Sequence, residues 1–331
     1  MKTEGRRNNM AEKKQSVLAL LDVLRRCSDE EHPLTVNEIK QHLENEYDLT
    51  LERRTIYSNI ELLSQNGYEV STYEDNRKGY YLLERQFDKG EVLLLCNAIH
   101  ASHFISNKQS DELISKLLST QSKYQAKEFQ DKVYMANPLK TPNKQLLYTI
   151  ETVSMAIRDH KKLQFIYQRY NKEKKLVPRR DEPYIVEPRY IVYADSRAYM
   201  IVTSANHDGF IHYRLDRMKD ALILNEKVRP LPKDVDAYEY ARNKLFMYTG
   251  EMNYVTFLCK NSIMDQMIDI FGPGLNVFGN DQDHFMITVK TSHTGAIYLA
   301  QQFMDSITII SPDDLREEFR NKLKEVAKNY R

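Results

Sequence analysis

The chain has 331 residues, of which 41% are hydrophobic and 29% are charged, and its formal net charge is +1. This length predicts two or three domains, and the composition excludes global disorder. No apolar run approaches the roughly 20 residues that a membrane helix needs, so we expect a cytoplasmic protein. Three isolated cysteines, Cys27, Cys96 and Cys259, fit a reducing compartment and predict neither a disulfide framework nor a metal site.

The net charge hides an uneven distribution along the chain. Residues 1–85 hold 13 Lys and Arg against 16 Asp and Glu, a net of −3, whereas residues 145–229 hold 16 against 11, a net of +5. The middle of the chain is therefore its basic part. Any DNA contact near the N-terminus must come from a local basic patch.

The pattern of residues 1–85 predicts three short helices followed by a β-hairpin. Helical spacing of apolar residues marks the first helix over 14–26, and a capping box at Thr35 opens the second. A third helix is expected over about 51–66, and residues 68–83 have the alternation of a hairpin with a polar tip. This order is typical of a winged helix-turn-helix domain.

In a winged helix, the third helix enters the major groove and the hairpin tip contacts the neighbouring backbone. Arginines can contact phosphates and guanine edges, and hydroxyl groups can position the backbone. Glu52 argues against tight binding, although a carboxylate in a first turn also suits the helix dipole. The alternative is an ordinary solvated helix face. The candidate DNA-binding residues are Arg53, Arg54, Thr55, Tyr57 and Ser58 on the helix and Arg77 and Lys78 at the hairpin tip.

Residues 86–144 are predicted to form a helical linker that also dimerises the protein. Two helices, over 89–105 and about 108–119, carry apolar residues on more than one face, which favours burial against each other or a second subunit. His100 and His103 have the spacing of two metal ligands, but no third donor is near, so we predict no metal there. The polar stretch 121–144 is interpreted as a connector.

Residues 145–230 predict one helix followed by about five short antiparallel strands, a small barrel of the Sm or SH3 kind. Counting by twos places polar and aromatic side chains opposite the apolar positions of these strands. Such a face suits a ligand with a ring and a phosphate, and the alternative is a solvated face with rim tyrosines. The residues on this face or just beyond it are Arg189, Tyr193, Arg197, Tyr199, His212, Arg214 and Arg217.

The same stretch resembles the WYL-domain transcriptional regulators. The resemblance rests on Glu187-Pro188, Ile191–Tyr193, Arg197-Ala-Tyr-Met200 and Tyr213-Arg-Leu-Asp-Arg-Met218, with Leu51–Ile60 similar to the family's recognition helix and Gly79–Leu82 to its wing. It implies a helix-turn-helix regulator whose WYL domain senses a nucleotide or single-stranded nucleic acid, often in phage defence or DNA damage. Carried over by position, the ligand candidates are Tyr199, Arg214 and Arg217, while Tyr193 and His212 depend on the face argument alone.

This sequence departs from the family pattern at three positions. The chain has no tryptophan, and Ala198 stands where the motif's Trp would pack in the core. Glu52 and Ser58 occupy positions where the family more often has Ser and Arg, which changes the expected DNA preference.

Residues 231–331 predict a short helical connector at 234–242 and then elements in the order βαββαβ. This order is ferredoxin-like, and we expect it to pack and dimerise rather than to perform chemistry. The predicted fold class is therefore α+β and multidomain, with a winged helix-turn-helix, a helical linker, an Sm/SH3-like barrel and a ferredoxin-like extension.

These predictions favour a homodimeric DNA-binding regulator, expected to be a repressor, that binds a pseudo-palindromic double-stranded operator and a nucleotide or oligonucleotide effector. One alternative is an accessory protein that binds RNA or nucleotides without an operator. The other is a nucleic-acid-processing enzyme. The sequence lacks a Gly-rich phosphate loop, zinc-ligand spacing and a nucleophile–base set, so we expect neither an enzyme nor a cofactor.

Overall fold

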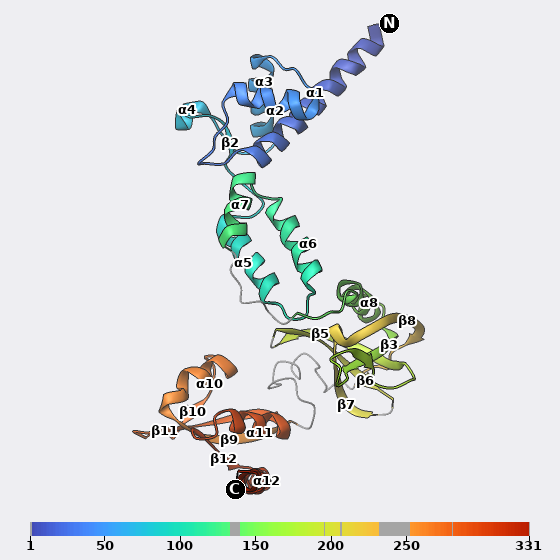
Figure 1. The fold of residues 1–331 in the computed structure, drawn as a ribbon, viewed down its shortest axis with the longest axis vertical. Helices are drawn as coiled ribbons and strands as arrows, with labels where there is room; N and C mark the ends of the chain where they lie inside the picture. The colour runs from blue at the N-terminus through green and yellow to red at the C-terminus, as the bar shows by residue number, and fades with distance from the viewer. Residues whose placement is uncertain are drawn as a thin grey trace. The chain divides into compact units, whose positions relative to one another are not determined.

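The structure is a computed structural model that describes residues 2–132, 140–194, 196–205, 207–231, 252–279 and 281–330. The chain divides into two compact units, Met1–Pro142 and Asn143–Arg331 (Figure 1), and each is described by itself. Within the described residues, no helix is both long and apolar enough to cross a bilayer.

The first unit begins with three helices that share one core. The first helix is longer than the predicted 14–26, and the third begins at Arg53 rather than Leu51. The predicted capping box is present, since the Glu38 carboxylate accepts from the Thr35 backbone N–H at 2.8 Å. Ile56, Ile60 and Leu63 are buried, as their spacing predicts. The helices are α1 (Lys2–Cys27), α2 (Val36–Tyr47) and α3 (Arg53–Gln65).

A small β-hairpin follows, formed by β1 (Val70–Ser71) and β2 (Tyr81–Leu82), with Val70 opposite Leu82. Its tip differs from the predicted polar loop, because a short helix, α4 (Tyr73–Asn76), lies between the strands. The reason is a second capping box, in which the Asp75 carboxylate accepts from the Thr72 N–H at 2.7 Å.

Three further helices complete the first unit. The polar connector expected over 121–144 is wrong in part, because α7 occupies most of its first half and buries Phe129 beside Val92, Cys96 and Leu118. Lys140 binds the C-terminal end of α5, since its ammonium donates to the carbonyls of Ile99 and Ser102, both at 3.1 Å. The helices are α5 (Lys89–Ala101), α6 (Asn107–Leu118) and α7 (Lys123–Lys132).

The second unit begins with a helix and an antiparallel sheet of six strands. The strand order is β4-β3-β5-β6-β7, and β8 pairs with β3. Helix α8 contacts β3, β5 and β8, and buries Leu146, Val153 and Ala156. The elements are α8 (Leu146–Arg158), β3 (Lys161–Tyr170), β4 (Leu176–Pro178), β5 (Tyr184–Ala194), β6 (Arg197–Ser204), β7 (His207–Arg214), the 3-10 helix η1 (Leu215–Arg217) and β8 (Met218–Lys227).

A second, four-stranded sheet lies in the C-terminal part of this unit, with order β10-β11-β9-β12 and antiparallel neighbours. Its helices pack on a core that includes Phe257, Phe285 and Leu299. The predicted connector at 234–242 lies outside the described residues. The elements are β9 (Met252–Lys260), η3 (Asn261–Ile263), α10 (Met264–Phe271), β10 (Val277–Phe278), β11 (His284–Ser292), α11 (His293–Gln302), β12 (Ile307–Ser311) and α12 (Asp313–Lys328).

Candidate nucleic-acid interface and effector site

The predicted DNA-contacting residues of α3 all lie outside the core. Arg53, Arg54 and Ser58 are exposed, Thr55 is half-buried, and Tyr57 is 48% exposed. The apolar side of the helix faces inward, so these polar side chains occupy the outer side. The helix therefore presents two guanidinium groups at its first turn.

The N-terminus of α3 also presents backbone donors. The first N–H groups of a helix have no intrahelical carbonyl partner, and Glu52, the N-cap residue, makes no capping hydrogen bond with its side chain. These N–H groups can donate to a phosphate, as at other helix N-termini. Arg53 is held near the start of α2, where it donates to the Asn37 side-chain oxygen at 3.1 Å.

The hairpin tip adds two more exposed cations, Arg77 and Lys78. Arg77 ends α4 in the left-handed region, with φ of 59°. The Asn76 side chain accepts from the Lys78 N–H at 2.7 Å and fixes the following turn. The rings of Tyr57 and Tyr80 lie 6.4 Å apart, so α3 and the hairpin are in contact.

Gly79 connects this hairpin to the rest of the domain. A Cβ at this position would lie 2.5 Å from the carbonyl oxygen of Leu34. Leu34 and Tyr80 exchange two backbone hydrogen bonds, at 2.9 and 2.8 Å. Only glycine allows this close approach, so the position of the hairpin depends on it.

In the second unit, the strand register brings together most of the predicted effector residues. Tyr199 on β6 is directly opposite Arg214 on β7, and Ile201 is opposite His212. Directly paired residues share a face, so Tyr199, His212 and Arg214 lie on one face of the sheet. The opposite face carries the buried residues Ala198, Met200, Val202 and Tyr213.

The prediction that Tyr193 lies on the same face as Tyr199 is wrong. Tyr193 pairs with Ala198, a core-face residue, whereas its neighbour Val192 pairs with Tyr199. The cause is an irregularity between Pro188 and Tyr190, where one extra residue shifts the alternation of β5.

Arg214 is already engaged within the protein. Its guanidinium donates to Asp216 through Nε at 2.9 Å and Nη2 at 2.6 Å, and the two side chains are 21% and 3% exposed. Burial by itself would lower the pKa of Arg214, but the hydrogen bonds to Asp216 raise it. Its backbone N–H donates to the Tyr167 hydroxyl at 3.2 Å. An anionic ligand must therefore compete with Asp216 for this arginine.

Arg217 keeps donor capacity that Arg214 has lost. Its guanidinium lies 4.7 Å from the ring centre of Tyr170, a cation–π contact. Its Nε is buried and has no hydrogen-bond partner among the described residues. Of the predicted effector residues, Arg217 therefore offers a buried guanidinium donor to an anion.

Sequence reasoning missed an ion cluster around Glu187. Arg229 donates to Glu187 at 2.9 Å, Arg189 donates to it at 3.1 Å, and the Thr203 hydroxyl also donates to it at 2.9 Å. Burial would raise the pKa of Glu187, but the hydrogen bonds from Arg229 and Thr203 lower it below its ordinary value. Glu187 belongs to the Glu-Pro pair of the family pattern, and this pair was the one feature of the sequence that could have pointed to the ion cluster.

Three tyrosines pack around the buried Phe165; Tyr213 is buried, and Tyr167 and Tyr184 are half-buried. Phe165, Tyr167, Tyr184 and Tyr213 form a cluster with ring centres 4.9 to 6.2 Å apart. Burial raises the pKa of Tyr213 to about 12, so its hydroxyl stays neutral. Ala198 is also fully buried on this face, where the family's tryptophan was expected to pack.

Comparison with known proteins gives one family match and distant structural matches. Residues 148–223 match the family model described as WYL domain. A search of curated proteins gives no significant match. Proteasome accessory factor B/C (PafBC) of Arthrobacter aurescens is 16% identical with a TM-score of 0.27, over 96% of this chain and 47% of that chain. A crystal structure of a CRISPR Cas-related protein is 16% identical with a TM-score of 0.37, over 96% of this chain and 85% of that chain.

The chain spans about half the length of PafBC. The family match covers α8 to β8, including the strand pair that holds Tyr199 and Arg214. Residues 148–223 therefore match a WYL domain, as the sequence motifs indicated.

Proposed function

We propose that this WYL-domain protein is a transcriptional regulator that binds DNA through α3 and the adjacent hairpin. The observation that carries the proposal is the exposed basic set on these two elements, Arg53, Arg54, Arg77 and Lys78. Lysine and arginine contacts to phosphates supply most non-specific affinity, and arginines at the start of a groove-binding helix can also contact guanine.

The finer fold assignments are part of this proposal. Three helices and a hairpin support a winged helix-turn-helix over 1–85, with the linker at 86–144. A helix followed by a bent antiparallel sheet supports an Sm/SH3-like barrel over 145–230. The order β10-β11-β9-β12 supports a ferredoxin-like extension over 231–331.

DNA selection followed by a binding measurement tests the DNA-binding function. The double variant Arg53→Ala with Arg54→Ala is expected to lower affinity for the selected operator by on the order of a hundredfold and to reduce the salt slope by about two. A matched variant, Arg316→Ala with Lys322→Ala, removes the same charge from exposed positions of α12 and should bind normally. Equal affinity of the two double variants would refute α3 as the contact, and no enriched sequence would favour the RNA-binding accessory protein.

We further propose that the face bearing Tyr199, His212, Arg214 and Arg217 binds a nucleotide or oligonucleotide effector that regulates DNA binding. The buried Nε of Arg217 supports this role, because a donor without a partner is costly unless a ligand accepts from it. The effector regulates DNA binding only if it binds two arrangements of the protein with different affinity. Titration with a short oligonucleotide should show weaker binding by Arg217→Ala, while the apo variant should bind operator normally.

Self-association through the helical linker completes the proposal. Leu94 on α5 is 70% exposed, and its neighbour Leu95 is partly exposed. Exposed leucines on one helix are typical of an interface, and a two-fold dimer matches a pseudo-palindromic operator. Light scattering should report a dimer for the native protein and a monomer for Leu94→Glu. A dimeric Leu94→Glu protein would place the interface elsewhere.

A further inference from the structure

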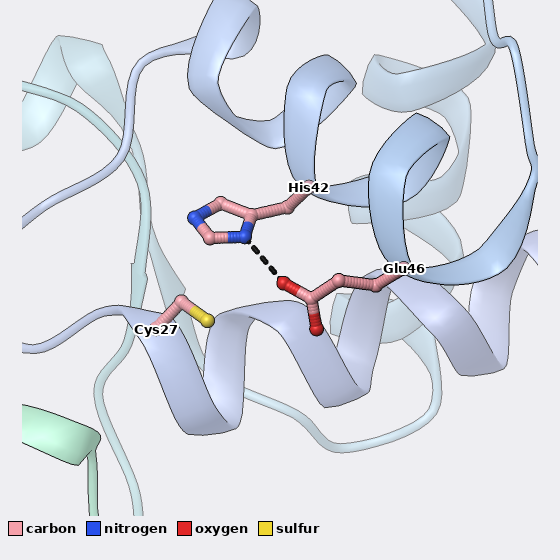
Figure 2. Close-up of side chains that lie close together, drawn as sticks. All are labelled: Cys27, His42 and Glu46. Carbon is pink, nitrogen blue, oxygen red and sulfur yellow. Dashed lines mark hydrogen bonds and ion pairs between the residues drawn. The ribbon is translucent and has the colours of Figure 1, made fainter.

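Three potential metal ligands meet between α1 and α2. Cys27 is the last residue of α1, and His42 and Glu46 are one helical turn apart on α2 (Figure 2). The cysteine sulfur, a ring nitrogen of the histidine and a carboxylate oxygen all lie within 4.8 Å of one another. Cys27 is buried, His42 is half-buried and Glu46 is exposed, so solvent reaches the group from the carboxylate side.

The donor types and their spacing suit a transition metal. Residues four apart on a helix present side chains on the same face, which is a common arrangement for two ligands of one ion. Thiolate, imidazole and carboxylate are the three groups that bind Zn²⁺ in proteins. A hard cation such as Mg²⁺ would prefer oxygen ligands only.

The three ligand atoms, which lie within 4.8 Å of one another, would each have to shift by up to about 1 Å to reach the separations that such an ion needs. His42 Nδ1 and Glu46 Oε1 are 2.6 Å apart and share a hydrogen bond, drawn as a dashed line in Figure 2. With metal–ligand bonds of about 2.0 to 2.3 Å in a tetrahedron, ligand atoms lie roughly 3.3 to 3.7 Å apart. The histidine and carboxylate would separate by about 1 Å as the metal replaces the shared proton, which rotations about their side-chain bonds allow.

Neighbouring residues already orient the carboxylate. Arg26 donates to the other oxygen of Glu46, Oε2, and leaves Oε1 toward His42. Arg26 is itself fixed by Asp22, which accepts from its Nε at 2.6 Å. Metal-ligating carboxylates are characteristically held by outer hydrogen bonds of this kind.

The thiol is the ligand that changes most on binding. Burial raises the pKa of Cys27, and the charged groups around it are Lys123, Arg26, Glu46 and Asp22. A bound divalent cation would stabilise the thiolate and release its proton. The spacing of these donors along the chain did not predict a site, because they come from two helices and meet only when α1 packs against α2.

We propose that Cys27, His42 and Glu46 bind a Zn²⁺-class divalent ion through sulfur, nitrogen and oxygen, with the fourth position left to water or an external donor. The ion would join the end of α1 to the middle of α2. Because it would bind the folded domain and not the unfolded chain, it would raise the stability of the domain that carries α3. Metal binding at Cys27, His42 and Glu46 does not depend on DNA binding.

Titration of the full-length metal-free protein with Co²⁺ tests the site, since Co²⁺ replaces Zn²⁺ and reports a thiolate ligand by a sulfur-to-cobalt charge-transfer band. One equivalent should bind with this band, and Zn²⁺ should abolish it by displacement. Cys27→Ser should lose the band, whereas Cys96→Ser and Cys259→Ser, which alter buried cysteines elsewhere, should keep it. Absence of the band in the native protein, or its survival in Cys27→Ser, would overturn the proposal.

Variants of the two more exposed ligands test the site even if the Cys27 variant fails to fold. His42→Gln and Glu46→Gln should each weaken Zn²⁺ binding on the order of tenfold or more while keeping the native circular dichroism spectrum. Zn²⁺ should also raise the melting temperature of the native protein but not of His42→Gln. Unchanged Zn²⁺ affinity in both variants would show that the metal binds elsewhere and would refute the site.

Discussion

The ion pair between Arg214 and Asp216 allows a sharp test of how the WYL domain is built. Replacing Arg214 with Met would leave the Asp216 carboxylate, which is 3% exposed, without its charged partner. Loss of one member of a buried ion pair costs about 3 to 5 kcal/mol, because the remaining charge stays away from water. The Arg214 side chain is 21% exposed, so water can partly replace it, and we expect about 3 kcal/mol.

The chain contains two units, so the measurement must report the WYL domain itself. Hydrogen exchange of peptides from β6 and β7, followed by mass spectrometry, gives the free energy of opening of this sheet. The Arg214→Met variant should exchange faster by on the order of a hundredfold, equivalent to about 3 kcal/mol. The double variant Arg214→Met with Asp216→Asn should recover at least about 1 kcal/mol, since the buried charge is gone.

The double-variant cycle separates pairing from simple packing. If the two side chains interact as the distances indicate, the effects of the single variants will not add in the double variant. An Arg214→Met protein within about 0.5 kcal/mol of the native protein would refute the reasoning, as would strict additivity. In either case Arg214 would be held loosely and free to bind an effector.

Three further predictions follow from single contacts. Gly79→Ala should destabilise the hairpin by more than about 1 kcal/mol and weaken operator binding, because the added Cβ would collide with the Leu34 carbonyl. Hydrogen exchange of the Tyr80 amide measures the loss of hairpin stability. Lys140→Met should cost about 1 to 3 kcal/mol in thermal unfolding, because the carbonyls at the end of α5 lose their donor. Glu187→Gln should lower stability at pH 7 and flatten its decline in acid. The folded pKa of Glu187 is lowered, so its contribution is present above the unfolded pKa of about 4.3 and is lost as pH falls through the folded value; unfolding at several pH values measures this.

Local pattern was enough to predict helix α3 and the side of it that is buried. Ile56, Ile60 and Leu63 repeat at three and four residues, and this spacing alone determines which side of α3 is buried. The capping box at Thr35 is equally local, since both partners lie within one turn. Such features depend on near neighbours in the chain, and the structure confirms them.

Other features depend on contacts that no local pattern contains. Helix α7 is polar by composition and is held by the burial of Phe129 against α5 and α6. The predicted face of Tyr193 was wrong because period-two counting assumes an unbroken strand. One irregularity in β5 reverses the faces of all residues beyond it. The partners of Arg189 and Glu187 include Arg229, which lies about forty residues away.

The arrangement of charges in the WYL domain constrains how an effector can bind. Asp216 neutralises Arg214 and Glu187 neutralises Arg189, whereas the buried Nε of Arg217 has no partner in the part of the chain that the structure describes. A ligand phosphate that took Arg214 from Asp216 would leave a buried carboxylate unpaired, at about 3 kcal/mol, and must gain more than this elsewhere. We therefore expect Arg217 to make the first contact. Arg214 would then pair with Asp216 in one state of the domain and with the ligand in the other. An effector that binds two such states with different affinity can shift the equilibrium between them.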